Sequence, residues 1–278
     1  MEDYKTILVH YDAGKAAPAR LQIAFELAAP FDAHVVALYA VSAVPEPSYG
    51  YEAAQILREA QQRLHAEMRE AARRSYDETV KRAGFERTEW RETRADALGA
   101  VALHARYSDL VVIGQQPPEM PAGVDKEFER SLPLASGRPV LIVPHALERH
   151  PVGRRVLVAW NASREAARAV SDALPLLRRA SHVHVLVLSP EISTAAHGEE
   201  PGADIGLFLA RHGVKLTVSR YEAVGIDTGN LLLSRAFDLS ADLIVMGAWG
   251  HSRLRELVLG GMTRTLMESM TVPVLMAH

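Results

Sequence analysis

Residues 243–250 of the chain read LIVMGAWG, and a second glycine-rich stretch, GGMT, follows at 260–263. The apolar run 243–246 predicts a buried strand, and the stretch 264–270 predicts a helix. A glycine-studded loop between a strand and a helix is suited to binding phosphate. Its backbone N–H groups can approach an anion where no Cβ intervenes, and the helix N-terminus adds its positive dipole end. The sequence therefore predicts an α/β unit with an anion-binding loop near its C-terminus.

Three apolar segments occur twice along the chain, in the same order. The pairs are 6–12 with 155–161, 108–114 with 241–247, and 138–143 with 272–276. The second and third pairs also share their flanking Asp, Gly and Pro residues, which a chance match of apolar runs would not supply. The sequence therefore predicts two homologous domains, which we place at residues 1–146 and 153–278, joined by a short polar stretch with two prolines.

Apolar runs alternate with helical patterns in both halves, as in an α/β fold. Strands are predicted near 6–11, 34–40, 86–91, 110–113 and 140–143, and near 155–159, 183–188, 214–220, 243–246 and 273–276. Helices are predicted near 16–29, 51–83 and 202–212. Strands such as 185–188 are apolar throughout, which indicates burial on both faces and therefore a parallel sheet between helix layers. The predicted fold class is α/β: two tandem doubly wound α/β sandwich domains, each with a five-stranded, mostly parallel sheet.

Composition narrows the classes of function. Hydrophobic residues make up 48% of the chain and charged residues 23%, as in soluble globular proteins, and the net charge of −3 argues against a nucleic-acid-binding surface. The chain has no cysteine, which excludes disulfides, thiolate metal sites and cysteine nucleophiles. We find no signal peptide and no apolar run near the ~20 residues of a membrane helix, so we expect a cytoplasmic protein without a membrane partner.

The sequence lacks the motifs of other nucleotide-binding proteins, of hydrolases and of zinc enzymes. The chain contains no Walker A string, no dinucleotide fingerprint after either first strand, and no Gly-x-Ser-x-Gly elbow. No pair of histidines has the His-x3-His spacing with a supporting acid that zinc enzymes use, although His182 and His184 alternate on a predicted strand. No catalytic residue and no metal ligand is therefore assigned.

The loops after strands one and four face each other in a doubly wound sheet. In the second half these loops are 161–163 and 247–262. The first supplies a side-chain amide, Asn161, which suits a ribose hydroxyl or a base edge, and the second supplies phosphate-binding backbone. Together they predict a nucleotide pocket.

The repeat, the strand order and the Gly-x2-Gly-x9-Gly spacing before a C-terminal Val-Pro-Val-Leu strand resemble the universal stress protein family in its tandem form. The resemblance covers nearly the whole chain. It implies the fold of that family, which is related to adenine nucleotide alpha hydrolases, and binding of ATP, or of ADP or AMP, with Mg²⁺ accompanying ATP. It also implies which residues bind the nucleotide: Asn161, Gly247, Gly250, Gly260, Gly261, Met262 and Thr263.

Two positions depart from the family pattern. Gly261 stands where the family usually has Ser or Thr, so a side-chain hydrogen bond to phosphate, worth about 1 kcal/mol, is missing unless Thr263 replaces it. Asn161 stands in place of an acid and can still accept a hydrogen bond. For five neighbouring residues two interpretations remain open: each contacts the ligand, or each has an ordinary surface position. These residues are Trp249, His251, Arg253, Arg255 and Arg264.

The corresponding loop of the first half is different. Residues 114–121 read GQQPPEMP, and three prolines remove backbone donors that a phosphate would need. Glu119, Asp125, Glu127 and Glu129 add negative charge. We expect this half to have lost its phosphate loop, although Asp12 keeps the acid at the end of the first strand.

These features predict a stress-response regulatory protein that binds adenine nucleotide in its C-terminal domain, with slow ATP hydrolysis or autophosphorylation at most. Two alternatives remain: an ATP-using enzyme of the same nucleotide-binding superclass, and a nucleotide-free interaction module. We also expect the last strands of the two halves to pair, because an uncovered apolar edge invites association. That pairing would make the chain an intramolecular pseudo-dimer, whether or not two chains then form a homodimer.

Overall fold

The computed structural model describes residues 3–41, 51–93, 95–116, 127–147, 151–188, 200–221, 227–248 and 261–278. The first repeat contains β1 Thr6–Tyr11, α1 Ala17–Ala28, the 3-10 turn η1 Ala29–Phe31, β2 His34–Tyr39, α2 Tyr51–Ala83, β3 Thr88–Glu92, α3 Ala97–Ala105, β4 Leu110–Gly114, α4 Phe128–Ser136 and β5 Val140–Val143. The second contains β6 Arg155–Trp160, α5 Arg164–Arg179, β7 His182–Leu188, α7 Ala203–Arg211, β8 Leu216–Tyr221, α8 Thr228–Asp238, β9 Leu243–Gly247, α9 Gly261–Ser269 and β10 Val274–Ala277.

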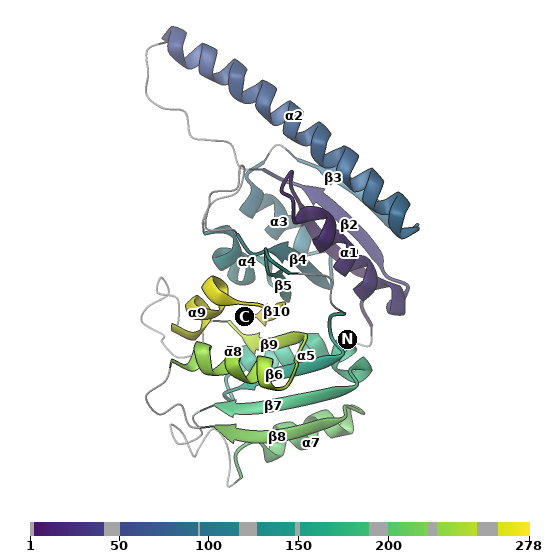
Figure 1. The fold of residues 1–278 in the computed structure, drawn as a ribbon, viewed down its shortest axis with the longest axis vertical. Helices are drawn as coiled ribbons and strands as arrows, with labels where there is room; N and C mark the ends of the chain where they lie inside the picture. The colour runs from purple at the N-terminus through teal and green to yellow at the C-terminus, as the bar shows by residue number, and fades with distance from the viewer. Residues whose placement is uncertain are drawn as a thin grey trace.

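The ten strands of the described residues belong to one sheet, in the order β3-β2-β1-β4-β5-β10-β9-β6-β7-β8 (Figure 1). Each repeat contributes five parallel strands in the doubly wound arrangement, as the apolar strands predicted. The repeats meet where β5 and β10 pair antiparallel, with Leu141 opposite Leu275. The prediction that the last strands pair is therefore confirmed, and the two five-stranded sheets form a single one.

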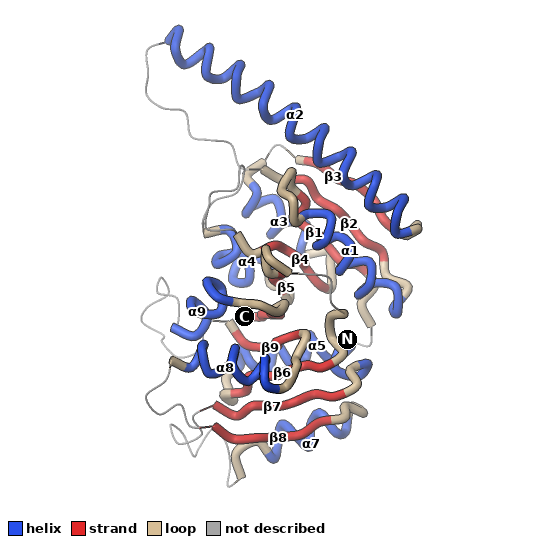
Figure 2. The backbone as a smooth tube through the Cα atoms, in the orientation of Figure 1, coloured by secondary structure: helices blue, strands red, loops and turns tan. Residues whose placement is uncertain are grey.

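Helices cover both faces of this sheet (Figure 2). Buried side chains of α1, α2, α5 and α7 pack on one face, and those of α3, α4, α8 and α9 pack on the other. Each of the two apolar layers contains residues of both repeats, so the core is continuous across the junction. The architecture is a three-layer α/β sandwich.

The long helix α2 is unlike the rest of the molecule. Its C-terminal half lies beside β3, where Ala72 and Tyr76 are buried, whereas its N-terminal part extends beyond the sheet (Figure 1). Ile56 and Leu64 on that part are 70% and 53% exposed. Among the helices that the structure describes, none is both long and apolar enough to cross a membrane.

The Asp that recurs before strand four has a structural role in both repeats. Asp109 accepts hydrogen bonds from the backbone N–H groups of Lys5 and Thr6, at 2.7 and 2.9 Å. Asp242 does the same for the start of β6, accepting from Gly153 N at 2.8 Å and from Arg155 N at 3.1 Å. The repeated carboxylate thus holds strand one against strand four, because it satisfies donors that precede the ladder.

Candidate functional site

The site predicted for the second repeat lies where β6 and β9 end side by side. The two strands are parallel neighbours, with Val158 opposite Val245. Asn161 directly follows β6 and Gly247 ends β9, so the structure brings these two predicted residues to the same edge of the sheet. Ligands of doubly wound sheets bind at this carboxyl edge.

Asn161 shapes the turn between β6 and α5. Its Oδ1 accepts a hydrogen bond from Ser163 N at 3.2 Å, and Ala162 between them has a φ of 57°. Ser163 then caps α5, because its Oγ accepts from Ala166 N at 3.1 Å. The turn thus uses the side-chain oxygen Oδ1 of Asn161, while the side-chain nitrogen Nδ2 takes no part in it.

Gly247 has a packing role that the sequence did not reveal. A Cβ at this position would stand 2.5 Å from Ala166 N and 2.6 Å from Glu165 C. The start of α5 therefore comes so close to the end of β9 that only glycine fits there. The absence of a side chain at 247 is explained by this helix without any bound phosphate.

The start of α9 carries three of the predicted residues. Gly261 is exposed and Met262 is half-buried, whereas Thr263 is only 3% exposed. Thr263 is thus packed beneath the helix, away from the surface position where the missing hydroxyl of residue 261 would stand. Gly250 and Gly260 lie outside the described residues.

Asp227, which the sequence analysis did not single out, lies beside Gly261. Its Oδ1 accepts from Asn230 N at 3.0 Å and so caps α8. Its Oδ2 is 4.0 Å from the place that a Cβ of Gly261 would occupy, the nearest contact to that place among the described residues outside α9 itself. Among the described residues, the carboxylate of Asp227 is therefore the side chain that borders the first residue of α9.

Other candidate residues have ordinary partners. Arg264 forms a surface ion pair with Glu268, at 2.9 Å, which favours the solvated-face interpretation. His182 and His184 bond to Thr217 Oγ1 and Ser219 Oγ at 3.0 and 2.7 Å. Within the described residues, no group of three His, Asp or Glu side chains is placed to hold a metal ion. Trp249, His251, Arg253 and Arg255 lie outside those residues.

In the first repeat the corresponding place is filled. Phe128 begins α4 as Gly261 begins α9, and it is 2% exposed. Its ring lies 4.8 Å from that of the buried His10, near the end of β1. Ala159 is the residue of β6 that corresponds to His10. Two large side chains thus occupy the first repeat where the second has alanine and glycine.

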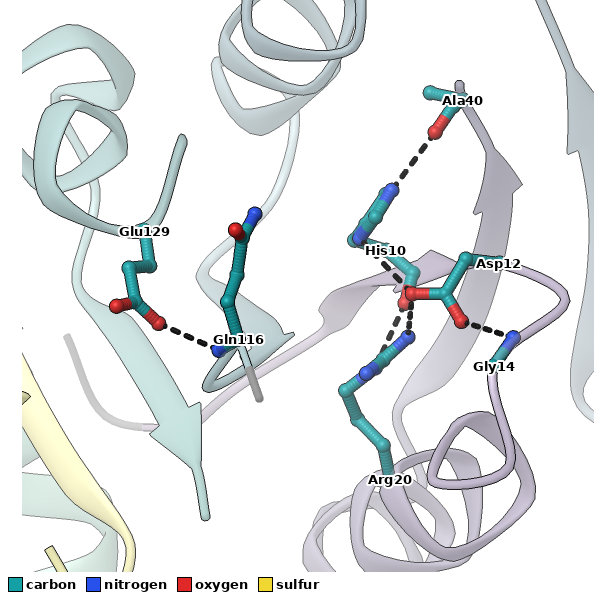
Figure 3. Close-up of polar contacts among 7 residues, drawn as sticks. All are labelled: His10, Asp12, Gly14, Arg20, Ala40, Gln116 and Glu129. Atoms are coloured by element: carbon teal, nitrogen blue, oxygen red, sulfur yellow. Dashed lines mark hydrogen bonds and ion pairs between the residues drawn. The ribbon is translucent and has the colours of Figure 1, made fainter. Parts of the chain in front are cut away.

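A network of hydrogen bonds and ion pairs surrounds His10 and Asp12 at the end of β1, as Figure 3 shows. The Arg20 guanidinium donates to Asp12 Oδ2 and to the His10 carbonyl oxygen, both at 2.9 Å. Asp12 Oδ1 accepts from Gly14 N at 2.8 Å, and His10 Nε2 lies 2.9 Å from the Ala40 carbonyl oxygen. The acid that ends β1 is therefore bound by an arginine of its own chain.

Burial and charge shift the pKa values in this network. Burial alone would raise the pKa of Asp12, but Arg20, His10 and the Gly14 N–H together lower that pKa below its ordinary value. Burial lowers the pKa of His10, which favours the neutral ring. The network therefore contains one compensated ion pair, Asp12 with Arg20.

Glu129, next to Phe128, is also buried, at 7% exposure. Its Oε2 accepts from the Gln116 backbone N–H at 2.8 Å (Figure 3). Burial raises the pKa of Glu129 to about 7. The carboxyl group of Glu129 thus occupies the Gln116 N–H, a donor that a phosphate bound after β4 would need.

Two segments of the chain, residues 3–124 and 153–278, match the universal stress protein family. The chain belongs to this family. Each match falls on one repeat, so the protein is a tandem universal stress protein. A comparison with curated proteins finds none that matches.

Solved structures agree in fold. A universal stress protein from Archaeoglobus fulgidus DSM 4304 is 15% identical, with a TM-score of 0.67 over 98% of this chain and 95% of its own. A putative universal stress protein from Pseudomonas aeruginosa UCBPP-PA14 is 19% identical, with a TM-score of 0.60 over 99% of this chain and 94% of its own. At these identities the likeness shows the tandem fold and carries no ligand assignment.

Proposed function

We propose that this tandem universal stress protein is a stress-response regulator that binds one adenine nucleotide, in its second repeat. The phosphates would lie at the N-terminus of α9 and the nucleoside near Asn161, with Gly250, Gly260, Gly261 and Met262 around them. Gly247 would contribute to the site indirectly, because its lack of a side chain leaves room for the start of α5. ATP, with Mg²⁺, is the nucleotide we expect first, ahead of ADP and AMP.

The contrast between Gly261 and Phe128 carries this proposal. The same position of the fold holds an exposed glycine in the second repeat, with no other described side chain within 4 Å of its Cβ position except Asp227, and a buried ring in the first. A helix N-terminus with open access is a favourable place for an anion, because its unpaired N–H groups and the helix dipole both attract negative charge. One occupied site per chain is therefore the expected stoichiometry.

A pair of substitutions at Gly261 tests the site. Gly261 is the first residue of the helix α9, and among the described residues only Asp227 Oδ2, at 4.0 Å, approaches the place of a new Cβ, so we expect alanine and serine both to fit. Gly261→Ser adds the hydroxyl common in the family, and Gly261→Ala is the matched control without it. We expect serine to bind ATP about fivefold more tightly than alanine, since one hydrogen bond is worth about 1 kcal/mol.

The measurement is calorimetric titration of the whole protein with Mg-ATP, ADP and AMP, after mass spectrometry for nucleotide that co-purifies. Absence of binding at millimolar ATP would refute the proposal and favour the nucleotide-free interaction module. Equal affinities of the serine and alanine variants for ATP would show that the start of α9 does not contact the nucleotide. Multiple turnover above roughly 1 s⁻¹ would favour the ATP-using enzyme instead.

A further inference from the structure

Gln115 of the first repeat makes a buried contact with the second. It directly follows β4 and is 6% exposed. Its Nε2 donates to the Met267 carbonyl oxygen at 2.7 Å, and its Oε1 accepts from His145 N at 3.2 Å and lies 3.0 Å from His145 Nδ1. Because the Met267 carbonyl can only accept and the His145 backbone N–H can only donate, the orientation of the Gln115 amide is unambiguous.

The carbonyl that Gln115 binds is at the end of α9. The last four carbonyls of a helix have no partner within it, and Met267 belongs to the last turn of Gly261–Ser269. A side chain of the first repeat therefore caps the helix whose first residue is Gly261. An ion pair also joins α4 to α9, from Arg130 to Glu268 at 3.5 Å, but it is half-exposed at Glu268 and contributes less.

This contact runs in one direction only. The residue of the second repeat that corresponds to Gln115 is Ala248, which follows β9 and has no side-chain donor. The second repeat therefore cannot cap α4 in the same way. The repeat whose own site is filled by Phe128 holds the helix of the repeat whose site is open.

We propose that Gln115 is a positioning residue for the nucleotide site of the second repeat, and that it transmits occupancy of that site to the first repeat through α9. This inference rests on the proposed function. A nucleotide held at the start of α9 fixes the helix, and the helix is fixed at its other end by Gln115. Binding therefore tightens the segment around β4 and His145, and loss of the cap leaves α9 less well placed for the ligand.

The test compares Gln115→Met, which has a similar length but no amide, with Gln62→Met on the exposed face of α2 as the matched control. Both are studied as full chains by calorimetric titration with Mg-ATP and by hydrogen exchange with and without the nucleotide. We expect Gln115→Met to raise the Kd roughly fivefold, the equilibrium equivalent of one buried hydrogen bond. We also expect it to abolish the nucleotide-dependent protection of β4 amides that the wild type and Gln62→Met show.

A purely structural role predicts a different result: Gln115→Met would lower thermal stability while the Kd and the protection of β4 stayed at wild-type values, and that result would overturn the inference. If Gln115→Met fails to fold, Gln115→Ala replaces it, because it removes the amide without placing a longer apolar side chain or a charge in the buried contact. Wild-type protein that binds no nucleotide would refute the proposed function, and this inference with it. Wild-type binding without any protection of β4 would overturn the inference alone.

Discussion

Asp227 is the residue whose charge most directly bears on the proposed site. It lies beside Gly261, yet it is also the N-cap of α8, and Asp96 caps α3 in the same way by accepting from Gly99 N at 3.1 Å. The capping role accounts for an acid in both repeats. In the second repeat that acid lies beside the first residue of α9, where a bound phosphate would meet like charge unless a cation lay between them.

Asp227→Asn tests this electrostatic conflict. Asparagine caps a helix as well as aspartate does, so the free energy of unfolding should change by less than about 0.5 kcal/mol. Affinity for ATP in the presence of EDTA should rise several-fold, and the gain from adding Mg²⁺ should shrink. Calorimetric titration with EDTA and with Mg²⁺ measures both effects, with Asp96→Asn as the control. Equal affinity of Asp227→Asn and wild type in EDTA would show that no phosphate approaches this carboxylate.

Glu129 makes stability depend on pH near neutrality. Its pKa in the folded protein is about 7, raised by burial, whereas an exposed glutamate titrates near pH 4.3. Between these values the folded chain holds a proton that the unfolded chain has released. Its contribution to stability is therefore fully present below about pH 4.3 and is lost as pH rises to about 7 and beyond.

Glu129→Gln removes this titration and keeps an acceptor for the Gln116 N–H. We expect the free energy of unfolding of the wild type to fall between pH 5 and pH 8 by on the order of 1–3 kcal/mol more than that of the variant. Urea denaturation at the two pH values measures the difference. Glu127→Gln, at an exposed residue of the same turn, should behave like wild type. A wild type and a Glu129→Gln variant with parallel pH profiles would contradict the assignment.

At the scale of elements, the sequence predicted most of the fold because each signal was local. Apolar strands indicated a parallel sheet, and helical spacing with a final glycine indicated α2 with its bounds of 51 and 83. The helices α3, α4, α5 and α8 were not predicted: α3 is apolar on most sides, and α4 and α5 each contain a proline, Pro133 and Pro175. Packing on the sheet specifies such helices more than their own sequence pattern does.

The geometry around the candidate site was visible in the sequence only in part, for the same reason. The spacing of the glycines is visible in the sequence, but the approach of α5 to Gly247 and the position of Asp227 beside Gly261 depend on tertiary packing. Arg20 did leave a signal: it is a charged residue on the apolar stripe of α1, among the buried Leu21 and Ala24. A buried arginine needs a partner, and the acid at the end of β1 is eight residues away.

The two halves of α2 should differ in their contribution to stability. Tyr76 is buried, with its ring 5.2 Å from that of Trp90 and its hydroxyl 3.0 Å from Thr88 Oγ1, whereas Ile56 is 70% exposed. We expect Tyr76→Ala to lower the free energy of unfolding by roughly 3 kcal/mol and Ile56→Ala by less than about 0.5 kcal/mol. Urea denaturation checks both. A comparable loss for Ile56→Ala would show that the projecting half of α2 is buried in solution.

At the scale of the whole molecule, the two repeats share their core. The apolar layers on both faces of the sheet cross the junction, and Tyr4 of the first repeat donates to the Asp172 carbonyl oxygen of the second at 2.8 Å. Both chain ends lie near this junction (Figure 1). A single continuous core favours cooperative unfolding of the two repeats, because neither can separate without exposing apolar surface of the other.

The junction of β5 and β10 is therefore the place to break that cooperativity. Wild-type protein should show one calorimetric transition, with a van't Hoff enthalpy close to the calorimetric one. Leu275 is fully buried opposite Leu141, so Leu275→Asp places an unpaired charge in the junction and should lower the midpoint and divide the transition into two. Leu103→Asp, at an exposed leucine of α3, is the control and should keep the single transition. Two transitions in the wild type would mean that the repeats fold independently. In that case β5–β10 pairing would join the two sheets without coupling their stability, and a nucleotide bound in the second repeat would raise the midpoint of that repeat alone.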